Sequence, residues 1–182
     1  MQKDTIAIHA GYDKKSGNGE MAIPISQTTA YAFRDAEHAA NLFALKELGP
    51  IYTRLNNPTN DILEQRYAQL ENGAAALVTA SGASAIFYSI ANIAEAGDNI
   101  LISDKLYGGS VTLFHFTLKR FGISVKTFKS DDASDLESLV DDKTKGIFFE
   151  SLSNPQIAIP AIEKIVEVGK KHGIITICDN TV

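Results

Sequence analysis

The stretch IITICD, residues 174–179, is the part of the sequence that decides the expected fold. Its apolar run has the composition of a strand buried on both faces, and a carboxylate, Asp179, follows the run directly. A carboxylate is costly to bury unless a partner stabilises its charge. Ligands of open α/β sheets bind at the carboxyl ends of the strands. We therefore expect Asp179 to meet a cationic partner at such an end, and a protonated heteroaromatic nitrogen would serve.

Helical and strand patterns alternate upstream of this run, whereas the first fifty residues are largely irregular. The expected strands are residues 75–79, 99–102, 124–128, 146–149 and 174–178. The expected helices are residues 35–48, 60–73, 81–96, 111–121, 135–140 and 160–172, with caps or stops at Asp35, at Asn60 or Asp61, and at Ser81, Gly122 and Gly173. This alternation predicts an α/β fold with a mostly parallel sheet and helices on both of its faces.

The bulk composition excludes several classes of function. The 182 residues are 45% hydrophobic, and the formal net charge is -5 without a long basic face, which argues against nucleic acid or an anionic membrane as partner. There is no run of transmembrane length and no apolar stretch suited to a signal peptide. The only cysteine, Cys178, can form no internal disulfide, so we expect a cytoplasmic setting. The four histidines lack metal-ligand spacing, and no metal site is expected.

Two short motifs could bind a phosphate group. Ser81-Gly82-Ala83 opens an expected helix, and the free backbone N–H groups of a helix start bind anions. In Tyr52-Thr53-Arg54, the guanidinium of Arg54 could grip a phosphate bidentately while the hydroxyl of Tyr52 adds one donor. Taken alone, the first motif is more often an ordinary capped turn, and the second a surface arginine beside a packed tyrosine.

Two further loops follow expected strands and carry groups suited to a flat ligand. Tyr107 follows the strand at 99–102 and precedes two glycines, which leave its ring face open for stacking. Asn154 follows the strand at 146–149, and its amide could hydrogen-bond a phenolic oxygen. Taken singly, these are also ordinary turns, one with a packing tyrosine and one built on Asn-Pro. Glu150 is expected to orient neighbouring backbone and is given no catalytic role.

As an ordered set, these motifs resemble the cystathionine γ-synthase-like family of pyridoxal-phosphate enzymes, and in particular its O-acetylhomoserine sulfhydrylase branch. The matching stretches are residues 8–12, 24–33, 51–59, 81–82, 106–109, 154–155 and 179–181. The helix expected at 35–48, with its Phe43-Ala44-Leu45, is typical of the sulfhydrylase branch. The resemblance spans nearly the whole chain and implies the fold of type I pyridoxal-phosphate-dependent transferases, present as an incomplete cofactor-binding domain.

The resemblance implies how a pyridoxal 5'-phosphate cofactor would be held within one subunit. Asp179 would pair with the pyridinium nitrogen, Tyr107 would stack on the ring and contact the substrate, and Asn154 would contact the ring's 3-oxygen. Ser81 would belong to the phosphate site together with the backbone N–H groups of Gly82 and Ala83.

The resemblance also implies that active sites are shared between subunits. Tyr52 and Arg54 would reach across an interface to a neighbour's phosphate. Residues 1–60 would then form an N-terminal arm and helix that serve the neighbouring site, and residues 61–182 would form the cofactor-binding α/β domain. The expected assembly is a homo-oligomer, in which a dimer is the smallest unit with complete sites and two dimers make a tetramer.

The reaction implied by the resemblance is a γ-replacement that converts O-acetylhomoserine and sulfide into homocysteine and acetate in methionine biosynthesis. Methionine γ-lyase and cystathionine γ-synthase share most of these residues, so their chemistry remains an alternative. The family's Schiff-base lysine lies in a Ser-x-Thr-Lys-type segment downstream of Asp-Asn-Thr, and its small C-terminal domain follows. Because neither occurs in the 182 residues, we expect this chain to be part of a longer polypeptide and inactive by itself. A cofactor-binding scaffold without turnover is the non-enzymatic alternative.

Overall fold

The computed structural model describes residues 2–15 and 19–182. The chain divides into two compact units, Met1–Val78 (unit 1) and Thr79–Val182 (unit 2). In the described residues no helix has the length and apolar character needed to cross a membrane.

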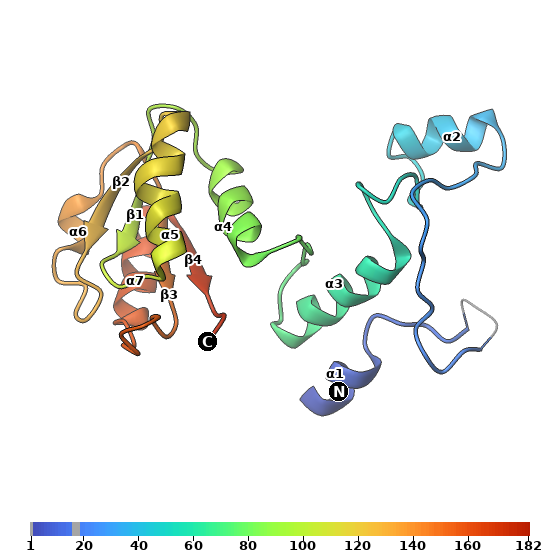
Figure 1. The fold of residues 1–182 in the computed structure, drawn as a ribbon, viewed down its shortest axis with the longest axis horizontal. Coiled ribbons are helices and arrows are strands. Elements are labelled where there is room, and N and C mark those ends of the chain that lie inside the picture. Colours follow the sequence, from blue (N-terminus) through green and yellow to red (C-terminus); the bar gives the residue numbers. More distant parts are fainter. Residues whose placement is uncertain (1, 16–18) are drawn as a thin grey trace. The chain divides into compact units, whose positions relative to one another are not determined.

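Unit 2 is built on a parallel sheet of four strands in the order β2-β1-β3-β4 (Figure 1). The strands are β1 (Asn99–Ser103), β2 (Ser124–Phe128), β3 (Thr144–Glu150) and β4 (Ile175–Asp179). Each lies within two residues of an expected strand. The predicted α/β class with a parallel sheet is thus confirmed.

Helices cover both faces of this sheet, because the strand residues alternate in direction. Ile100 and Ile102 of β1 pack on one face with α4 (Gly82–Ala91) and the helix that begins with α5 (Gly108–Thr112), whereas Leu101 packs on the other face. That second face carries the short helix α6 (Leu136–Leu139) and α7 (Ile162–His172), as Figure 1 shows. The buried apolar side chains thus form two hydrophobic clusters, one on each face of the sheet, and together these clusters are the core of unit 2.

The helix that starts at α5 is longer and less regular than predicted. It begins three residues earlier than expected, at Gly108, and continues as a π-helical turn, Leu113–Thr117, and a 3₁₀ turn, Leu118–Phe121. It ends where predicted, at Gly122, whose φ of 77° lies in the left-handed region that glycine adopts without strain. The end of α7 at Gly173 follows the same rule and is confirmed, although α7 starts two residues beyond Pro160.

Unit 1 contains α1 (Lys3–His9), α2 (Ala36–Phe43) and α3 (Pro58–Leu70), joined by extended segments. The cap of α2 is confirmed, since the Asp35 carboxylate accepts a hydrogen bond from the His38 backbone N–H at 2.7 Å. The helix ends at Phe43 and not near residue 48, because Leu45 adopts a positive φ of 55° that breaks the helical path.

Three expectations for the first eighty residues were wrong. The cap of α3 is Asn57, which accepts from the Thr59 backbone N–H at 2.9 Å, and not Asn60 or Asp61; the helix then starts with a proline, which suits its first turn. The helix α1 lies in a segment expected to be irregular and packs against α3. Residues 75–79 form no strand, because no described segment lies alongside to pair their backbone groups.

The hydrophobic core of unit 1 is small. Ala10 and Leu42 are its only buried hydrophobic side chains among the described residues. Large apolar side chains stand exposed instead, including Phe43, Leu48 at 88% and Leu77 at 75%. The hydrophobic free energy that fully buried side chains supply to unit 1 is correspondingly small.

Asp141 joins the starts of β1 and β3 at the amino end of the sheet. Its carboxylate accepts hydrogen bonds from the Lys126 ammonium at 2.6 Å and the Asn99 amide at 2.8 Å, and further bonds from Thr144 and the backbone of Lys143. The Lys126 contact first, and the Asn99 contact second, hold the pKa of the Asp141 carboxyl well below its usual value.

The lowered pKa of Asp141 gives a testable pH dependence of stability. A carboxyl whose folded pKa lies below its unfolded pKa stabilises the fold fully above the unfolded value, and this contribution fades as the pH falls through the folded pKa. We expect Asp141→Asn in the full-length protein to lower the urea midpoint at pH 7, and this difference to shrink progressively below about pH 4. Urea unfolding of both proteins between pH 7 and pH 2 measures it, and a difference that stays constant or grows towards pH 2 contradicts the assignment.

Candidate active site

The carboxyl ends of β3 and β4 bring two carboxylates together on one face of the sheet. Glu150 and Asp179 are register partners on these neighbouring parallel strands. Two residues earlier, Phe148 and Ile177 pack in the cluster under α4 and α5. Because side chains repeat every second residue in a strand, both carboxylates extend from the face that α4 and α5 cover.

A cavity of about 400 Å³ lies at this edge, and every residue that lines it belongs to unit 2. Five of the residues predicted from the sequence line it: Gly82, Ala83, Tyr107, Asn154 and Asp179. The other lining residues are Ile86, Gly109, Ser110, Leu113, Glu150, Leu152, Thr181 and Val182. The structure therefore collects side chains that lie almost one hundred residues apart in the sequence.

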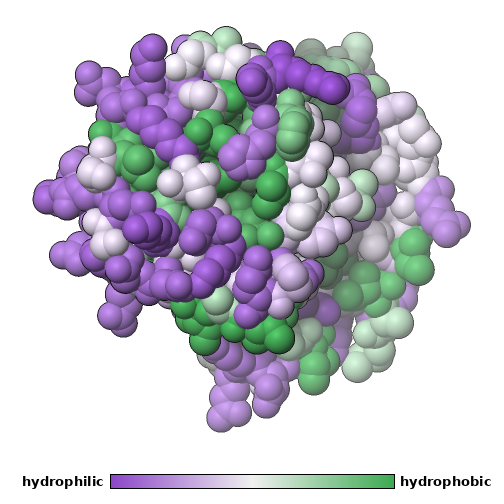
Figure 2. Space-filling view, turned by 60° about the vertical axis from the view of Figure 1, so that its left-hand side comes forward, coloured by the Kyte–Doolittle hydropathy of each residue, from purple (hydrophilic) through white to green (hydrophobic). Residues whose placement is uncertain are grey.

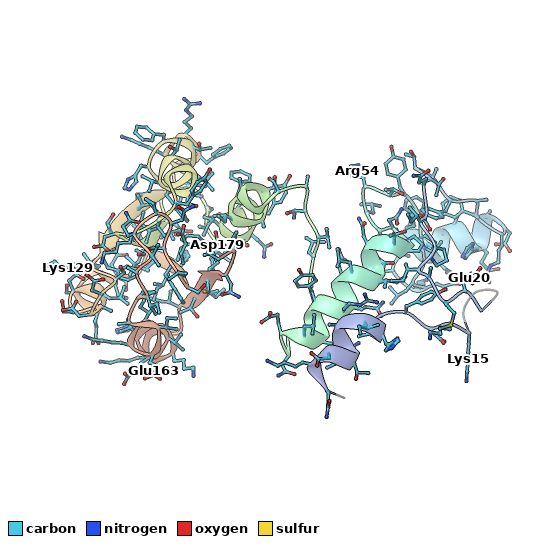
Figure 3. All side chains as sticks on the ribbon, turned by 60° about the horizontal axis from the view of Figure 1, so that its bottom comes forward. Lys15, Glu20, Arg54, Lys129, Glu163 and Asp179 are labelled. Atoms are coloured by element: carbon cyan, nitrogen blue, oxygen red, sulfur yellow. The ribbon has the colours of Figure 1, made fainter. Side chains whose placement is uncertain are left out.

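Asp179, labelled at the end of β4 in Figure 3, is half-buried and keeps one oxygen available. Its Oδ1 accepts hydrogen bonds from the backbone N–H of Thr181, at 3.1 Å, and from the Thr181 hydroxyl. Within the described residues no group donates a hydrogen bond to Oδ2. The Thr181 contacts fix the direction of the carboxylate, which leaves Oδ2 as an acceptor for a ligand N–H group.

Glu150 is the most deeply buried charged group of the cavity, at 5% exposure. Its Oε1 accepts a hydrogen bond from the backbone N–H of Tyr107 at 2.7 Å, and its Oε2 accepts one from the backbone N–H of Asn154 at 3.2 Å. The expectation that Glu150 orients neighbouring backbone is confirmed. The sequence does not reveal that the two amides belong to two candidate site residues.

The start of α4 presents backbone donors at the cavity. Ser81 caps this helix, because its hydroxyl oxygen accepts a hydrogen bond from the Ser84 backbone N–H at 3.1 Å. The N–H groups of Gly82 and Ala83 find no acceptor among the described residues, as expected for the first turn of a helix. A Cβ placed on Gly82 would meet nothing within 4 Å, so the backbone there is open to a ligand. Direct contact between the Ser81 side chain and a phosphate stays a prediction.

The ring of Tyr107 is 55% exposed and lies against the backbone of the second glycine that follows it. A Cβ placed on Gly109 would come within 2.5 Å of Tyr107 Cε1, closer than real Cβ contacts. A Cβ placed on Gly108 would meet nothing within 4 Å, and Gly108 does not line the cavity. The absent side chain at Gly109 therefore sets where the tyrosine ring can lie.

This contrast predicts different outcomes for two neighbouring alanine substitutions in the full-length protein. Gly109→Ala must displace the Tyr107 ring and is expected to lower turnover about tenfold, because small misplacements of a positioning group are costly. Gly108→Ala is the matched control and is expected to retain turnover. Both variants should keep their melting temperature, since alanine suits a helix better than glycine. Steady-state kinetics and thermal melts measure this, and equal turnover of the two variants would contradict the steric role of Gly109.

Ser110 is a cavity residue that sequence reasoning missed. It is 3% exposed and lines the cavity, and in the described part of the chain its hydroxyl has no hydrogen-bond partner. Its only sequence signal is its position after the two glycines.

Cys178, on the opposite face of β4 from Asp179, has a raised thiol pKa, caused first by burial and second by the Asp179 charge. No group of three possible metal-ligating side chains comes together within residues 2–15 and 19–182.

Tyr52 and Arg54 belong to unit 1 and form a small assembly of their own. The guanidinium carbon of Arg54 lies 5.6 Å from the centroid of the Tyr52 ring, which is the geometry of a cation–π contact. The backbone between them is held by the Thr53 N–H, which donates to the Thr29 carbonyl at 2.8 Å, and by a bridge between Ala30 and Tyr52. Figure 3 labels Arg54 in the loop before α3. Their contact with a neighbour's phosphate stays a prediction.

Comparison with known proteins places this arrangement in a family. A sequence profile described as "Cys/Met metabolism PLP-dependent enzyme" matches residues 4–182. The chain is 44% identical over 178 residues to a homocysteine synthase of Schizosaccharomyces pombe, covering 98% of this chain and 42% of that protein. It is 45% identical over 182 residues to O-acetyl-L-homoserine sulfhydrylase 1 of Thermus thermophilus, covering 100% of this chain and 43% of the relative.

Solved structures give the same result. A crystal structure of a Campylobacter jejuni protein assigned as an O-acetylhomoserine (thiol)-lyase, which carries N'-pyridoxyl-lysine-5'-monophosphate, matches with a TM-score of 0.96 and 51% identity. The match covers 100% of this chain and 45% of that one. The chain thus spans about two fifths of the length of the curated relatives it matches. The predicted fold type is confirmed, and the chain belongs to the Cys/Met metabolism family of PLP-dependent enzymes.

Proposed function

We propose that the full-length protein containing this chain is an O-acetylhomoserine sulfhydrylase. It converts O-acetylhomoserine and sulfide into homocysteine and acetate by a pyridoxal-phosphate-dependent γ-replacement. The observation that carries the proposal is the likeness to the Campylobacter jejuni O-acetylhomoserine (thiol)-lyase, because 51% identity and a TM-score of 0.96 extend over the entire chain. Both curated relatives named above also make homocysteine or use O-acetylhomoserine according to their names.

The cavity of unit 2 suits pyridoxal phosphate in size and chemistry. Its volume of about 400 Å³ lies in the usual range for small-molecule sites. The backbone N–H groups of Gly82 and Ala83 at the start of α4 suit the phosphate. The open Oδ2 of Asp179 suits the pyridinium nitrogen, and the amide of Asn154 suits the ring's 3-oxygen. The exposed ring of Tyr107 suits stacking on the pyridine.

The chain's own residues would bind and orient the cofactor, whose ring acts as an electron sink when it is bound. Asp179 would hold a proton on the ring nitrogen, since a carboxylate favours the charged form of a neighbouring cation. Tyr107 would stack on the ring and contact the substrate. Ile86, Leu113 and Leu152 add apolar walls, which exclude water and strengthen the electrostatic contacts inside.

We further propose that Tyr52 and Arg54 complete the phosphate site of a neighbouring subunit, so that a dimer is the smallest active unit and dimers pair into a tetramer. Residues 1–60 would form the arm that makes this contact, and residues 61–182 the domain that receives it. The exposed apolar side chains and small core of unit 1 support the proposal, because a neighbouring subunit would supply the missing cover. The single cysteine suits the reducing cytoplasm, where we place the enzyme.

Acceptor preference tests the reaction. The purified full-length protein, loaded with pyridoxal phosphate, is given O-acetylhomoserine with sulfide, with cysteine or without a sulfur acceptor, and methionine in a separate reaction. We expect sulfide to give a kcat/KM at least about tenfold above the other acceptors, a ratio within ordinary substrate discrimination. Faster reaction with cysteine would indicate cystathionine γ-synthase chemistry. Faster breakdown of methionine would indicate a γ-lyase, and either result would overturn the proposal.

A further inference from the structure

We propose that Glu150 is a positioning residue of the active site, which ties Tyr107 and Asn154 together and thereby sets both side chains relative to Asp179. The inference rests on the proposed cofactor site, and it extends the expected backbone contact of Glu150 to a role in the geometry of that site. It is carried by the two hydrogen bonds that the Glu150 carboxylate accepts, one per oxygen, from two separate loops of the cavity.

The placement of Glu150 makes it the one carboxylate that can serve as this link in the described part of the cavity. It ends β3 beside Asp179, and neighbouring strands lie about 4.8 Å apart. The two carboxylates nevertheless differ. One oxygen of Asp179 accepts hydrogen bonds from Thr181 and the other accepts none within the described residues, whereas each oxygen of Glu150 accepts a hydrogen bond from a backbone N–H.

Each of the two loops that Glu150 joins is closed by its own hydrogen bonds. Within the described residues, no other hydrogen bond connects Tyr107 or Asn154 to the opposite loop. On one side, the Tyr107 carbonyl accepts from the Val111 N–H at 3.0 Å, which forms the first turn of α5. On the other side, the turn that contains Asn154 is closed by two bonds: the Ser153 N–H donates to the Ala158 carbonyl at 3.0 Å, and the Ala158 N–H donates to the Ser153 hydroxyl oxygen at 3.1 Å. Glu150 is therefore the bond that sets one preformed turn against the other.

The chemistry of the link requires a carboxylate. Glu150 is nearly fully buried, and within the described residues it forms no ion pair with a cation. A buried charge without a cation is costly, and two backbone donors are what offset it here. A glutamine has a single acceptor oxygen, and its NH₂ group would face one of the two N–H donors. An aspartate keeps both oxygens and the charge, but its side chain is shorter by one methylene.

Two substitutions in the full-length protein separate positioning from charge. Glu150→Gln keeps the reach but loses one acceptor and the charge, whereas Glu150→Asp keeps the charge but loses the reach. If the role is positioning, both variants bind pyridoxal phosphate about tenfold more weakly, as expected for the loss of one hydrogen bond to a charged group. Both also show a weaker visible circular dichroism signal of the bound cofactor, because the ring is less firmly oriented.

Asp104→Asn is the matched control. Asp104 follows the neighbouring strand β1, and its Oδ1 accepts from the backbone N–H and the hydroxyl of Ser130 at 3.0 and 2.6 Å, but it does not line the cavity. This control variant is expected to keep wild-type cofactor affinity and dichroism, even where its melting temperature falls. A matching loss in Asp104→Asn would show that general destabilisation is the cause, and would overturn the proposal.

The remaining outcomes also decide the matter. If both Glu150 variants keep wild-type dichroism and cofactor affinity, the positioning role is overturned. It is also overturned if only Glu150→Gln loses them, because that result indicates an effect of charge alone. If Glu150→Gln does not fold, Glu150→Asp alone decides, because it must still show the loss. The readouts are independent of the reaction: if the wild-type protein binds the cofactor but fails to use O-acetylhomoserine, the proposed activity fails while the role of Glu150 is still measured.

Discussion

Replacing Asp179 with asparagine in the full-length protein is expected to lower turnover about 100-fold or more. The substitution keeps the size of the side chain and its contacts with Thr181, but it removes the charge that would hold a proton on the cofactor's ring nitrogen. A hydrogen bond between charged groups is worth about 1.5–3 kcal/mol, which corresponds to roughly 10- to 150-fold in rate when the contact is needed in the transition state. Loss of ring protonation adds to this, because the ring then withdraws electrons less strongly.

Steady-state turnover with O-acetylhomoserine and sulfide measures the effect. Asp104→Asn is the matched control, because Asp104 directly follows β1 of the same sheet and does not line the cavity. The variant should still bind pyridoxal phosphate, since the N–H groups at the start of α4 remain. The visible absorption of the bound cofactor should change with pH, and this change should occur at a lower pH in the variant than in the wild-type protein. The reason is that a less stabilised ring proton is lost more easily. Turnover within about threefold of wild type would contradict the role given to Asp179.

The parts of unit 2 that depend on local pattern were predictable from the sequence. The apolar runs that became β1 to β4, the left-handed glycines that close two helices and the serine that caps α4 follow from short-range rules. Because parallel strands share their carboxyl ends, the gathering of Tyr107, Asn154 and Asp179 at one cavity also followed from the predicted parallel sheet.

The rest depends on contacts that no short window contains. Residues 75–79 have the composition of a strand, but a strand requires a hydrogen-bonded neighbour, which the described residues do not supply. The cap of α3 is the exception, because an asparagine directly before a proline is itself a short-range helix start, which the prediction of Asn60 or Asp61 overlooked. The link from Glu150 to Tyr107 spans forty-three positions, and a carboxylate after a strand indicates only that some partner is needed.

Two inactive variants are expected to restore activity to each other if Arg54 serves the neighbouring subunit's site. Arg54→Ala should abolish most turnover, because the phosphate loses a bidentate cation. Asp179→Asn should be inactive for the reason given above. In a mixed dimer, the Arg54→Ala subunit contributes a normal Asp179, and the Asp179→Asn subunit contributes a normal Arg54 to the same site. One of the two sites of each mixed dimer is then intact. Because random pairing makes about half of all dimers mixed, the unfractionated mixture should recover about a quarter of wild-type activity per site, and isolated mixed dimers about half.

The experiment coexpresses the two variants with different affinity tags, isolates the mixed oligomers and measures their turnover against each variant alone. The control is a mixture of Asp179→Asn with Glu150→Gln, because both changes lie in unit 2 and the mixed dimer then contains no intact site. If Arg54 instead acted within its own subunit, each site of the mixed dimer would carry one of the two defects, and activity would stay at the level of the separate variants. Recovery with the Arg54 pair and none with the control pair would establish that the arm of one chain completes the site of another, because no arrangement confined to a single chain yields an intact site from these two variants.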